Sequence, residues 1–166
     1  KEAVNFPETP LLYYSLAVLA RDDLDITDWA DLNSPDISVS VPQATSMDAF
    51  LTENAPNADI QRFPGNAEAI AAFQAGRVDA VTLFHPPLIA ARQKLGSGQI
   101  VVPQPVESRP SSVAVRKEGD PAFVNWVNEQ IDGYYKSGQT QTWYEEFLSD
   151  FGLDPSTVPA IIRERL

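Results

Sequence analysis

The chain has 166 residues and a formal net charge of −11, from 12 Lys and Arg against 23 Asp and Glu. This acidic balance argues against a nucleic-acid partner, which needs clustered cations to displace the counterions of phosphates, and against docking on anionic lipid. There is no Cys and a single His, which excludes disulfides, a cysteine nucleophile and a multi-histidine metal site. The length allows a real hydrophobic core in one domain or two small lobes.

The first two thirds of the chain alternate strand and helix patterns. The apolar run at residues 11–20 (LLYYSLAVLA) predicts a buried strand, and residues 37–41 (ISVSV) alternate with period two, which is typical of a half-buried strand. The later elements are predicted as helices over 46–54, 67–75 and 86–95 and strands over 78–83 and 100–102. This alternation indicates a mainly parallel α/β sheet.

The last third of the chain is mainly helical. We predict a strand over 112–115 and helices over 122–137 and 140–151, with a short helix after Pro155. Three aromatic residues of these helices are expected to pack in the core and between helices and not to form a site: Trp126, Trp143 and Tyr144.

The first candidate ligand-binding position is the junction after strand 37–41, at Thr45 and Ser46. In an open α/β sheet, ligands bind beyond the carboxyl ends of the strands, where helices begin. A helix amino terminus offers unpaired N–H groups and a partial positive charge, which suit a carboxylate or similar anion. The alternative, which the local sequence favours, is that Thr45 or Ser46 is an ordinary helix cap.

The second candidate is the Phe84-His85-Pro86 corner after strand 78–83. The positive end of a helix favours the neutral imidazole of His85, which can donate a hydrogen bond from one nitrogen and accept one at the other. The ring of Phe84 can stack on a flat ligand. The alternative is a packed aromatic beside a surface or structural histidine.

Three further patterns were weighed. Tyr13 and Tyr14 combine an apolar ring with a polar tip, but neighbours on a strand point to opposite faces, so at most one is expected to face a cleft. Ser46, His85 and Asp79 include the residue types of a hydrolase triad, but no G-x-S-x-G motif accompanies them. No glycine-rich phosphate loop occurs. The sequence therefore assigns no catalytic residue, metal or cofactor.

Five segments in succession resemble stretches of one known family, and the first is residues 1–20 (KEAVNFPETPLLYYSLAVLA), which look like the stretch that enters a first hinge. Residues 39–50 (VSVPQATSMDAF) resemble a V-x-V-x-x-G-T passage, and residues 69–80 (AIAAFQAGRVDA) resemble the motif ALxxGxxDA. Residues 111–121 (SSVAVRKEGDP) are similar to a returning hinge, and residues 125–152 to a pair of closing helices. In this order, along nearly the whole chain, they resemble the type II periplasmic substrate-binding proteins of ABC importers, especially the polar amino-acid family.

The resemblance implies an α/β fold of the type II periplasmic-binding-protein class, with two lobes joined by a two-stranded hinge. Residues 1–20 would be a fragment of lobe 1 with the first hinge strand, residues 21–112 a complete lobe 2, and residues 113–166 the second hinge strand with the closing helices of lobe 1. The resemblance also implies that the N-terminal part of lobe 1 is missing from the sequence. The pieces of lobe 1 should then expose apolar surface.

The resemblance further implies how a ligand is held. A lobe 1 arginine that pairs with an amino-acid carboxylate would lie upstream of this sequence. The threonine of the G-T passage is matched by Thr45, although Ala44 replaces the glycine. The aspartate that holds the amino group falls five residues after Asp79, where this chain has Phe84. Because a buried ammonium without a carboxylate partner is costly, we expect an organic anion or a cationic group held by aromatic faces.

The function that the resemblance implies is the extracytoplasmic solute-binding component of an ABC transporter. Such a protein closes two lobes on a small organic solute, here an anion or a non-standard amino-acid-like compound, and docks on a membrane permease. We expect it to be periplasmic or extracytoplasmic, monomeric when complete, not an enzyme, and without a nucleic-acid partner. Two alternatives remain: a cyclohexadienyl dehydratase-like enzyme with His85 as acid or base, and the ligand-sensing ectodomain of a membrane receptor.

Overall fold

The computed structural model describes residues 4–117 and 119–163 and divides the chain into two compact units. Unit 1 is made of Lys1–Tyr14 and Ser108–Leu166, and unit 2 is Ser15–Glu107. Unit 2 is therefore one continuous stretch of chain, whereas unit 1 combines two separate stretches.

The borders between the units, 14/15 and 107/108, lie six and five residues before the positions assigned by the resemblance, 20/21 and 112/113. The first border falls inside strand β2 (Leu12–Ala20). Residues 16–20 of this strand pair with another strand of unit 2, so the contacts of its second half belong to that unit.

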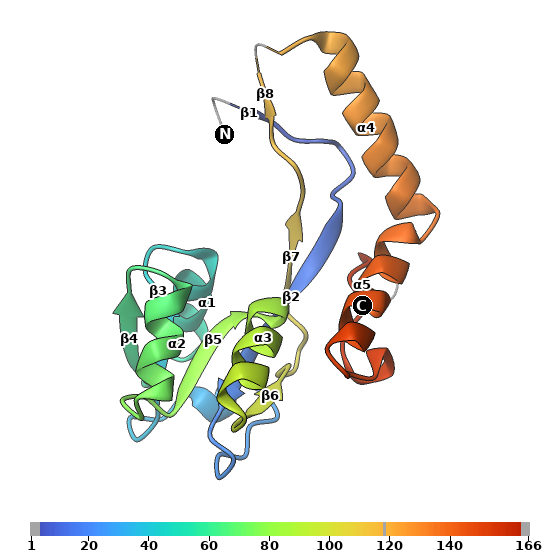
Figure 1. The fold of residues 1–166 in the computed structure, drawn as a ribbon. Coiled ribbons are helices and arrows are strands. Elements are labelled where there is room, and N and C mark those ends of the chain that lie inside the picture. The colour runs from blue at the N-terminus through green and yellow to red at the C-terminus, as the bar shows by residue number, and fades with distance from the viewer. Residues whose placement is uncertain (1–3, 118, 164–166) are drawn as a thin grey trace. The chain divides into compact units, whose positions relative to one another are not determined.

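The sheet of unit 2 has the strand order β4-β3-β5-β2-β6 (Figure 1). Besides β2, it consists of β3 (Ser38–Pro42), β4 (Asp59–Phe63), β5 (Ala80–Phe84) and β6 (Gln99–Val101). Strand β3 pairs in parallel with β4 and β5, whereas β2 is antiparallel to β5 and to β6. Four of these five strands thus run in one direction and β2 runs against them.

Strand β4 was not predicted from the sequence. Its five residues, DIQRF, lie at the edge of the sheet, where Asp59 and Arg62 are exposed and Ile60 is only half-buried. An edge strand of this kind lacks the regular apolar alternation that reveals a half-buried strand. The strand separates two helices that the sequence placed in direct succession.

The helices of unit 2 are α1 (Ser46–Asn54), α2 (Asn66–Gln74) and α3 (His85–Leu95), close to the predicted bounds. Thr45 caps α1, and Gly96 ends α3 with φ +71°, a left-handed conformation that glycine adopts readily. Helix α2 begins at Asn66, and Gly65 holds its cap position without a side-chain hydrogen bond. A short 3₁₀ helix, Trp29–Leu32, precedes β3.

The connections of the sheet change direction between β3 and β5. From β3, the chain passes through α1 to β4 on one side, and from β5 it passes through α3 to β6 on the other side (Figure 1). The crossover from β3 through α1 to β4 and the crossover from β4 through α2 to β5 run in opposite directions along the sheet. Because crossovers between parallel strands are right-handed, α1 and α2 lie on opposite faces of the sheet. The neighbouring carboxyl ends of β3 and β5 therefore form a topological switch point.

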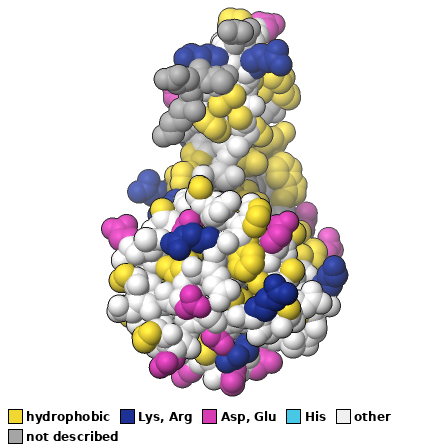
Figure 2. Space-filling model, turned by 90° about the vertical axis from the view of Figure 1, so that its left-hand side faces the viewer, with side chains coloured by type: hydrophobic (Ala, Val, Ile, Leu, Met, Phe, Trp, Pro, Cys, Tyr) yellow, Lys and Arg dark blue, Asp and Glu magenta, His cyan; other side chains and the backbone are white. Residues whose placement is uncertain are grey.

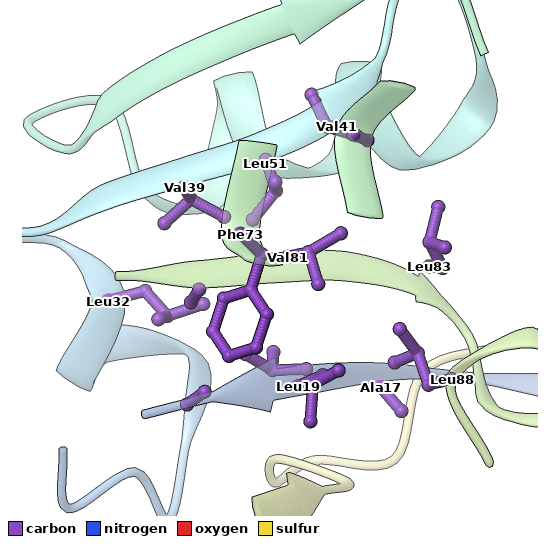
Figure 3. Close-up of a cluster of buried hydrophobic side chains, with 14 of the residues drawn as sticks. Ala17, Leu19, Leu32, Val39, Val41, Leu51, Phe73, Val81, Leu83 and Leu88 are labelled. Carbon is purple, nitrogen blue, oxygen red and sulfur yellow. The ribbon is translucent and has the colours of Figure 1, made fainter. Parts of the chain in front are cut away.

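One cluster of buried apolar side chains fills unit 2 (Figure 3). Phe73 of α2 points toward Leu19 of β2 and Val81 of β5, and both aliphatic side chains are fully buried. On β3, the buried Ser40 hydroxyl donates to the carbonyl of Ala69 in α2 at 3.0 Å. This bond satisfies a polar group that would otherwise be costly to bury.

The surface of unit 2 carries charges of both signs. In the view of Figure 2, Lys and Arg side chains lie interspersed with Asp and Glu over the rounded lower part. On this face the acidic balance of the chain is not concentrated in one patch.

Unit 1 is built from short strands and two long helices. Its elements are β1 (Val4–Asn5), the first residues of β2, β7 (Ser108–Ser111), β8 (Val115–Arg116), α4 (Pro121–Lys136), α5 (Gln139–Asp150) and a 3₁₀ helix, Pro155–Thr157. Strand β1 is antiparallel to β8, and β7 pairs with β2. The predicted strand 112–115 is wrong over most of its length: the two pairings leave a gap at residues 112–114, where Val113 is exposed.

The aromatic residues of α4 and α5 correct another expectation. Tyr144 is buried as predicted, but Trp126 and Trp143 are exposed by 56% and 46%. The buried face of α4 carries Val127 and Ile131, one turn apart, and Trp126 lies beside that stripe. Trp143 does contact the other helix, through an edge-on arrangement with Tyr134 of α4 at 5.1 Å between ring centroids.

Among the described residues, no helix has the length and apolar character needed to cross a bilayer.

Candidate functional site at the switch point

The switch point of unit 2 brings two of the predicted positions to neighbouring strand ends. Thr45 and Ser46 follow β3, and Phe84 and His85 end β5 and begin α3. Strands β3 and β5 are parallel and directly paired, so both positions lie at the same edge of the sheet. Ligands of open α/β sheets bind at this kind of edge, where connections leave in opposite directions.

The hydroxyl of Thr45 is occupied by the protein itself. Its Oγ1 donates to the carbonyl of Pro42 at 2.7 Å and accepts from the N–H of Asp48 at 3.3 Å. A hydroxyl has one proton to donate, so the Thr45 side chain has no proton left for an anion. The cap alternative is correct for Thr45.

Ser46 is the first residue of α1 and is exposed. The first N–H groups of a helix have no acceptor inside it, so the main chain and the hydroxyl of Ser46 lie where donors for a ligand are available.

The turn that leads into α1 contains a left-handed residue that is not glycine. Ala44 has φ +57°, the only positive φ of a non-glycine residue in the described part of the chain. This conformation costs an L-residue about 1–2 kcal/mol. Ala44 occupies the glycine position of the resembled G-T passage, so the backbone keeps the shape that the glycine allows.

The corner after β5 presents its two rings unequally. Phe84 is half-buried, whereas His85 is only 4% exposed. Burial lowers the pKa of His85 to about 4, so the imidazole is neutral at neutral pH. A neutral imidazole was expected at this helix start, and burial of the ring is the cause that lowers its pKa. Of the two rings, Phe84 offers more surface to a ligand.

The hydrolase triad composed from Ser46, His85 and Asp79 does not form. Asp79 directly precedes β5 and His85 directly follows it, so they lie roughly 20 Å apart at about 3.3 Å per residue. The Asp79 carboxylate instead accepts the N–H and hydroxyl of Ser38 at 2.8 and 2.6 Å and pairs with Arg21 at 2.7 Å. Burial raises the pKa of Asp79, but Ser38 and Arg21 outweigh it and hold the pKa below its usual value.

Tyr13 and Tyr14 belong to unit 1 and not to the unit that carries the switch point. The rings of Tyr13 and Tyr135 of α4 lie edge-on, with 6.4 Å between their centroids. The main-chain N–H of Tyr13 donates to the carbonyl of Ile161. Burial, with a smaller contribution from Tyr14, raises the pKa of Tyr144 in α5. The structure thus groups four of the six predicted residues at one sheet edge and gives the two tyrosines contacts within unit 1.

Two polar residues beside the switch point were missed by sequence reasoning. Asp48 of α1 and Arg62 of β4 form an ion pair, with 2.8 Å between Arg62 Nε and Asp48 Oδ1. The spacing of Thr45 and Asp48 is that of a capping box and could have identified Asp48. Arg62 could not have been identified, because β4 itself was not predicted.

No cluster of three or more potential metal-ligating side chains occurs in the described ranges 4–117 and 119–163.

The chain is similar in fold to solved structures of binding proteins. No family model and no curated protein matches the chain. Among solved structures, an ancestral amino-acid-binding protein that is a precursor of cyclohexadienyl dehydratase is 32% identical, with a TM-score of 0.67 over 88% of this chain and 62% of that one. The solute receptor for L-cysteine of Neisseria gonorrhoeae is 29% identical, with a TM-score of 0.66 over 87% of this chain and 57% of that one.

A third structure, from Wolinella succinogenes and complexed with lysine, is 23% identical with a TM-score of 0.71 over 86% of this chain and 62% of that one, and shows the likeness of fold. The chain spans about three fifths of the length of these relatives. With its mixed sheet and its two passages between units, the chain has the α/β fold of the type II periplasmic binding proteins and is similar to solved amino-acid-binding proteins and solute receptors.

Proposed function

We propose that the complete protein captures a small organic anion outside the cytoplasm and delivers it to an ABC permease. The observation that carries this proposal is the switch point, where the exposed start of α1 and the half-buried Phe84 lie at neighbouring strand ends. The solved relatives support a solute-binding role, since their names describe amino-acid-binding proteins and solute receptors. Residues 1–20, 21–112 and 113–166 would supply the lobe 1 fragment, lobe 2 and the returning part of lobe 1.

The chemistry of the switch point favours an anionic group with an apolar body. The donors available are the hydroxyl and N–H of Ser46, which suit a carboxylate or sulfonate. Phe84 stands where the resembled family has a carboxylate for an ammonium group, and its ring can stack on a flat solute. In this proposal Ser46 holds the anion, Thr45 shapes the turn and Phe84 contacts the apolar part. Tyr13 and Tyr14 would contribute only if a ring reaches the solute.

The relatives named above bind amino acids, so an amino acid is the rival ligand class. Thermal shift of the complete protein distinguishes the two, with benzoate and benzenesulfonate compared with the proteinogenic amino acids. We expect the aromatic anions to raise the melting temperature in a saturable manner and without chemical turnover. Stabilisation by proteinogenic amino acids alone would contradict the role given to Phe84.

Substitutions at the two strand ends sharpen this test. Ser46→Ala removes one donor to a charged group and should weaken benzenesulfonate binding about tenfold or more. Phe84→Asp should weaken it further, because a carboxylate replaces the ring and repels the anion. Phe84→Tyr keeps the ring and is the matched control, with binding close to that of the parent protein.

An enzyme on the same fold is the second candidate, because one relative is a precursor of cyclohexadienyl dehydratase. This alternative requires His85 as its acid or base. His85 is buried and its pKa is about 4, so the imidazole carries no extra proton at neutral pH and cannot act as a general acid there. Turnover of prephenate or arogenate by the complete protein, lost in His85→Ala, would favour the enzyme over the transport component.

A further inference from the structure

We infer that Asp48 is a positioning residue that sets the conformation of the turn before α1, and that Arg62 holds the Asp48 carboxylate in place. The inference rests on the proposed function for its consequence in binding, but its structural part stands on contacts within unit 2. Neither residue needs to touch the solute.

The Asp48 carboxylate closes the turn onto the helix. Asp48 Oδ2 accepts a hydrogen bond from the N–H of Ala44 at 2.9 Å, and the main-chain N–H of Asp48 donates to the Thr45 hydroxyl at 3.3 Å. These two bonds span the left-handed Ala44 and the capping Thr45 from the same residue. Asp48 therefore offsets the strain at Ala44 and determines the direction in which the exposed Ser46 leaves the turn.

The second oxygen of Asp48 is held from outside the turn. Oδ1 accepts from Arg62 Nε at 2.8 Å, and Arg62 Nη2 donates at 2.8 Å to the Thr52 hydroxyl, whose own proton goes to the Asp48 main-chain carbonyl at 2.8 Å. The Asp48 side chain is only 13% exposed, whereas that of Arg62 is 42% exposed. An edge-strand cation thus neutralises a nearly buried carboxylate and fixes which oxygen faces the turn.

This arrangement has a consequence for an anionic solute. An aspartate in the first turn of a helix competes with an external anion for the same positive end. With Arg62 paired to it, Asp48 can orient the turn while its charge is compensated. Removal of Arg62 should therefore weaken anion binding without freeing the N–H of Ala44.

The test compares Asp48→Ala, Asp48→Asn and Arg62→Met with Glu53→Gln as the matched control. Glu53 lies on the same helix and is exposed, so its substitution removes one carboxylate charge away from the turn. The readouts are amide hydrogen exchange and NMR shifts of residues 44–47 in this chain, and benzenesulfonate affinity of the complete protein.

We expect Asp48→Ala to accelerate exchange at Ala44 about tenfold, the loss of one hydrogen bond to a charged acceptor, and to shift the amide signals of Thr45 and Ser46. Asp48→Asn keeps an acceptor oxygen and should restore most of the protection. Arg62→Met should leave Ala44 protected yet weaken benzenesulfonate about threefold, and Glu53→Gln should change neither. Unchanged exchange at Ala44 in Asp48→Ala would overturn the inference. If benzenesulfonate does not bind the parent protein, the proposed function fails in its anionic form, and the exchange data alone decide the role of Asp48.

Discussion

Unit 2 and unit 1 differ in how they bury their apolar side chains. In unit 2, residues such as Leu19, Val81 and Leu83 are fully buried in one cluster that includes side chains of all three of its helices. The large hydrophobic side chains that are exposed in the described part of the chain all belong to unit 1: Phe6, Val113, Phe123, Trp126, Tyr134 and Trp143.

The difference is concentrated on α4. Phe123 and Trp126 stack with 6.1 Å between ring centroids, and they border an apolar groove of about 290 Å³ together with Val115 and Ile131. Within the described residues of unit 1, no element covers these rings. The expectation that the pieces of lobe 1 expose apolar surface agrees with this exposure. Apolar side chains thus form a closed core only where the neighbouring elements cover them.

The largest expected effect tests whether unit 2 is self-sufficient. A chain of residues 15–107 alone should unfold cooperatively in urea, with a free energy of unfolding of about 5–15 kcal/mol, the range of small domains. The reason is that its sheet, helices and core lie within one continuous stretch. The measurement is far-ultraviolet circular dichroism against urea concentration. A gradual, non-cooperative loss of signal would show that unit 2 depends on unit 1.

A pair of substitutions then contrasts the two units. Leu83→Ala in unit 2 should lower the free energy of unfolding by about 2–5 kcal/mol, because it leaves a cavity in a close-packed core. Trp126→Ala in unit 1 should change it by less than about 1 kcal/mol, since more than half of the side chain already lies in solvent. Urea unfolding of the whole chain gives both values. Equal losses would contradict the contrast between the units.

The pH dependence of unit 2 should reveal its buried histidine. The unfolded chain binds a proton at His85 below about pH 6.5, whereas burial lowers the pKa in the folded chain to about 4. Between these values the unfolded state holds more protons, so stability falls as the pH decreases from 6.5 to 4, by about 3 kcal/mol in total.

Urea unfolding at a series of pH values measures this slope, and His85→Gln should remove the contribution of the imidazole to it. His85 is the only histidine, so no other imidazole contributes. Parallel slopes in the parent chain and in His85→Gln would show that the imidazole is not buried in the folded state.

The smallest expected effect concerns the left-handed turn. Ala44→Gly should leave the free energy of unfolding unchanged or raise it by up to about 1 kcal/mol, because relief of strain at φ +57° offsets the added freedom of the unfolded chain. Ala49→Gly, an exposed position within α1, is the matched control and should lose about 0.5–1 kcal/mol. Thermal or urea unfolding compares the two. A loss at Ala44 as large as at Ala49 would mean that the turn is not strained.

The elements that the sequence predicted best have strong local signals. Helix α1 follows a capping threonine, and α3 is bounded by Pro86 and Gly96. Strand β2 is apolar or aromatic at every position except Ser15. In each case the residues that define the element lie within it or next to it, so one sequence suffices to find it.

Features that depend on distant partners could not be predicted. Strand β4 is recognisable as a strand only through its pairing with β3, since its own side chains are half-buried or exposed. The exposure of Trp126 depends on which elements face α4, which helical periodicity alone does not reveal. At the candidate site, the sequence located Thr45, Ser46, Phe84 and His85, but not that Thr45 Oγ1 is already bonded.

The discontinuity of unit 1 has a consequence for the order of folding during synthesis. All residues of unit 2 emerge in one stretch and can form their sheet before the closing helices exist. The first segment of unit 1 can complete its contacts only after the C-terminal part of the chain has been made. The main-chain N–H of Tyr13 donates to the carbonyl of Ile161, and the Thr9 hydroxyl donates to Asp132 at 2.8 Å. Such contacts between distant parts of the chain form slowly. On the ribosome, the first segment of unit 1 is thus the part of the chain that stays longest without its partners. It is therefore the part that most needs protection from association with other chains.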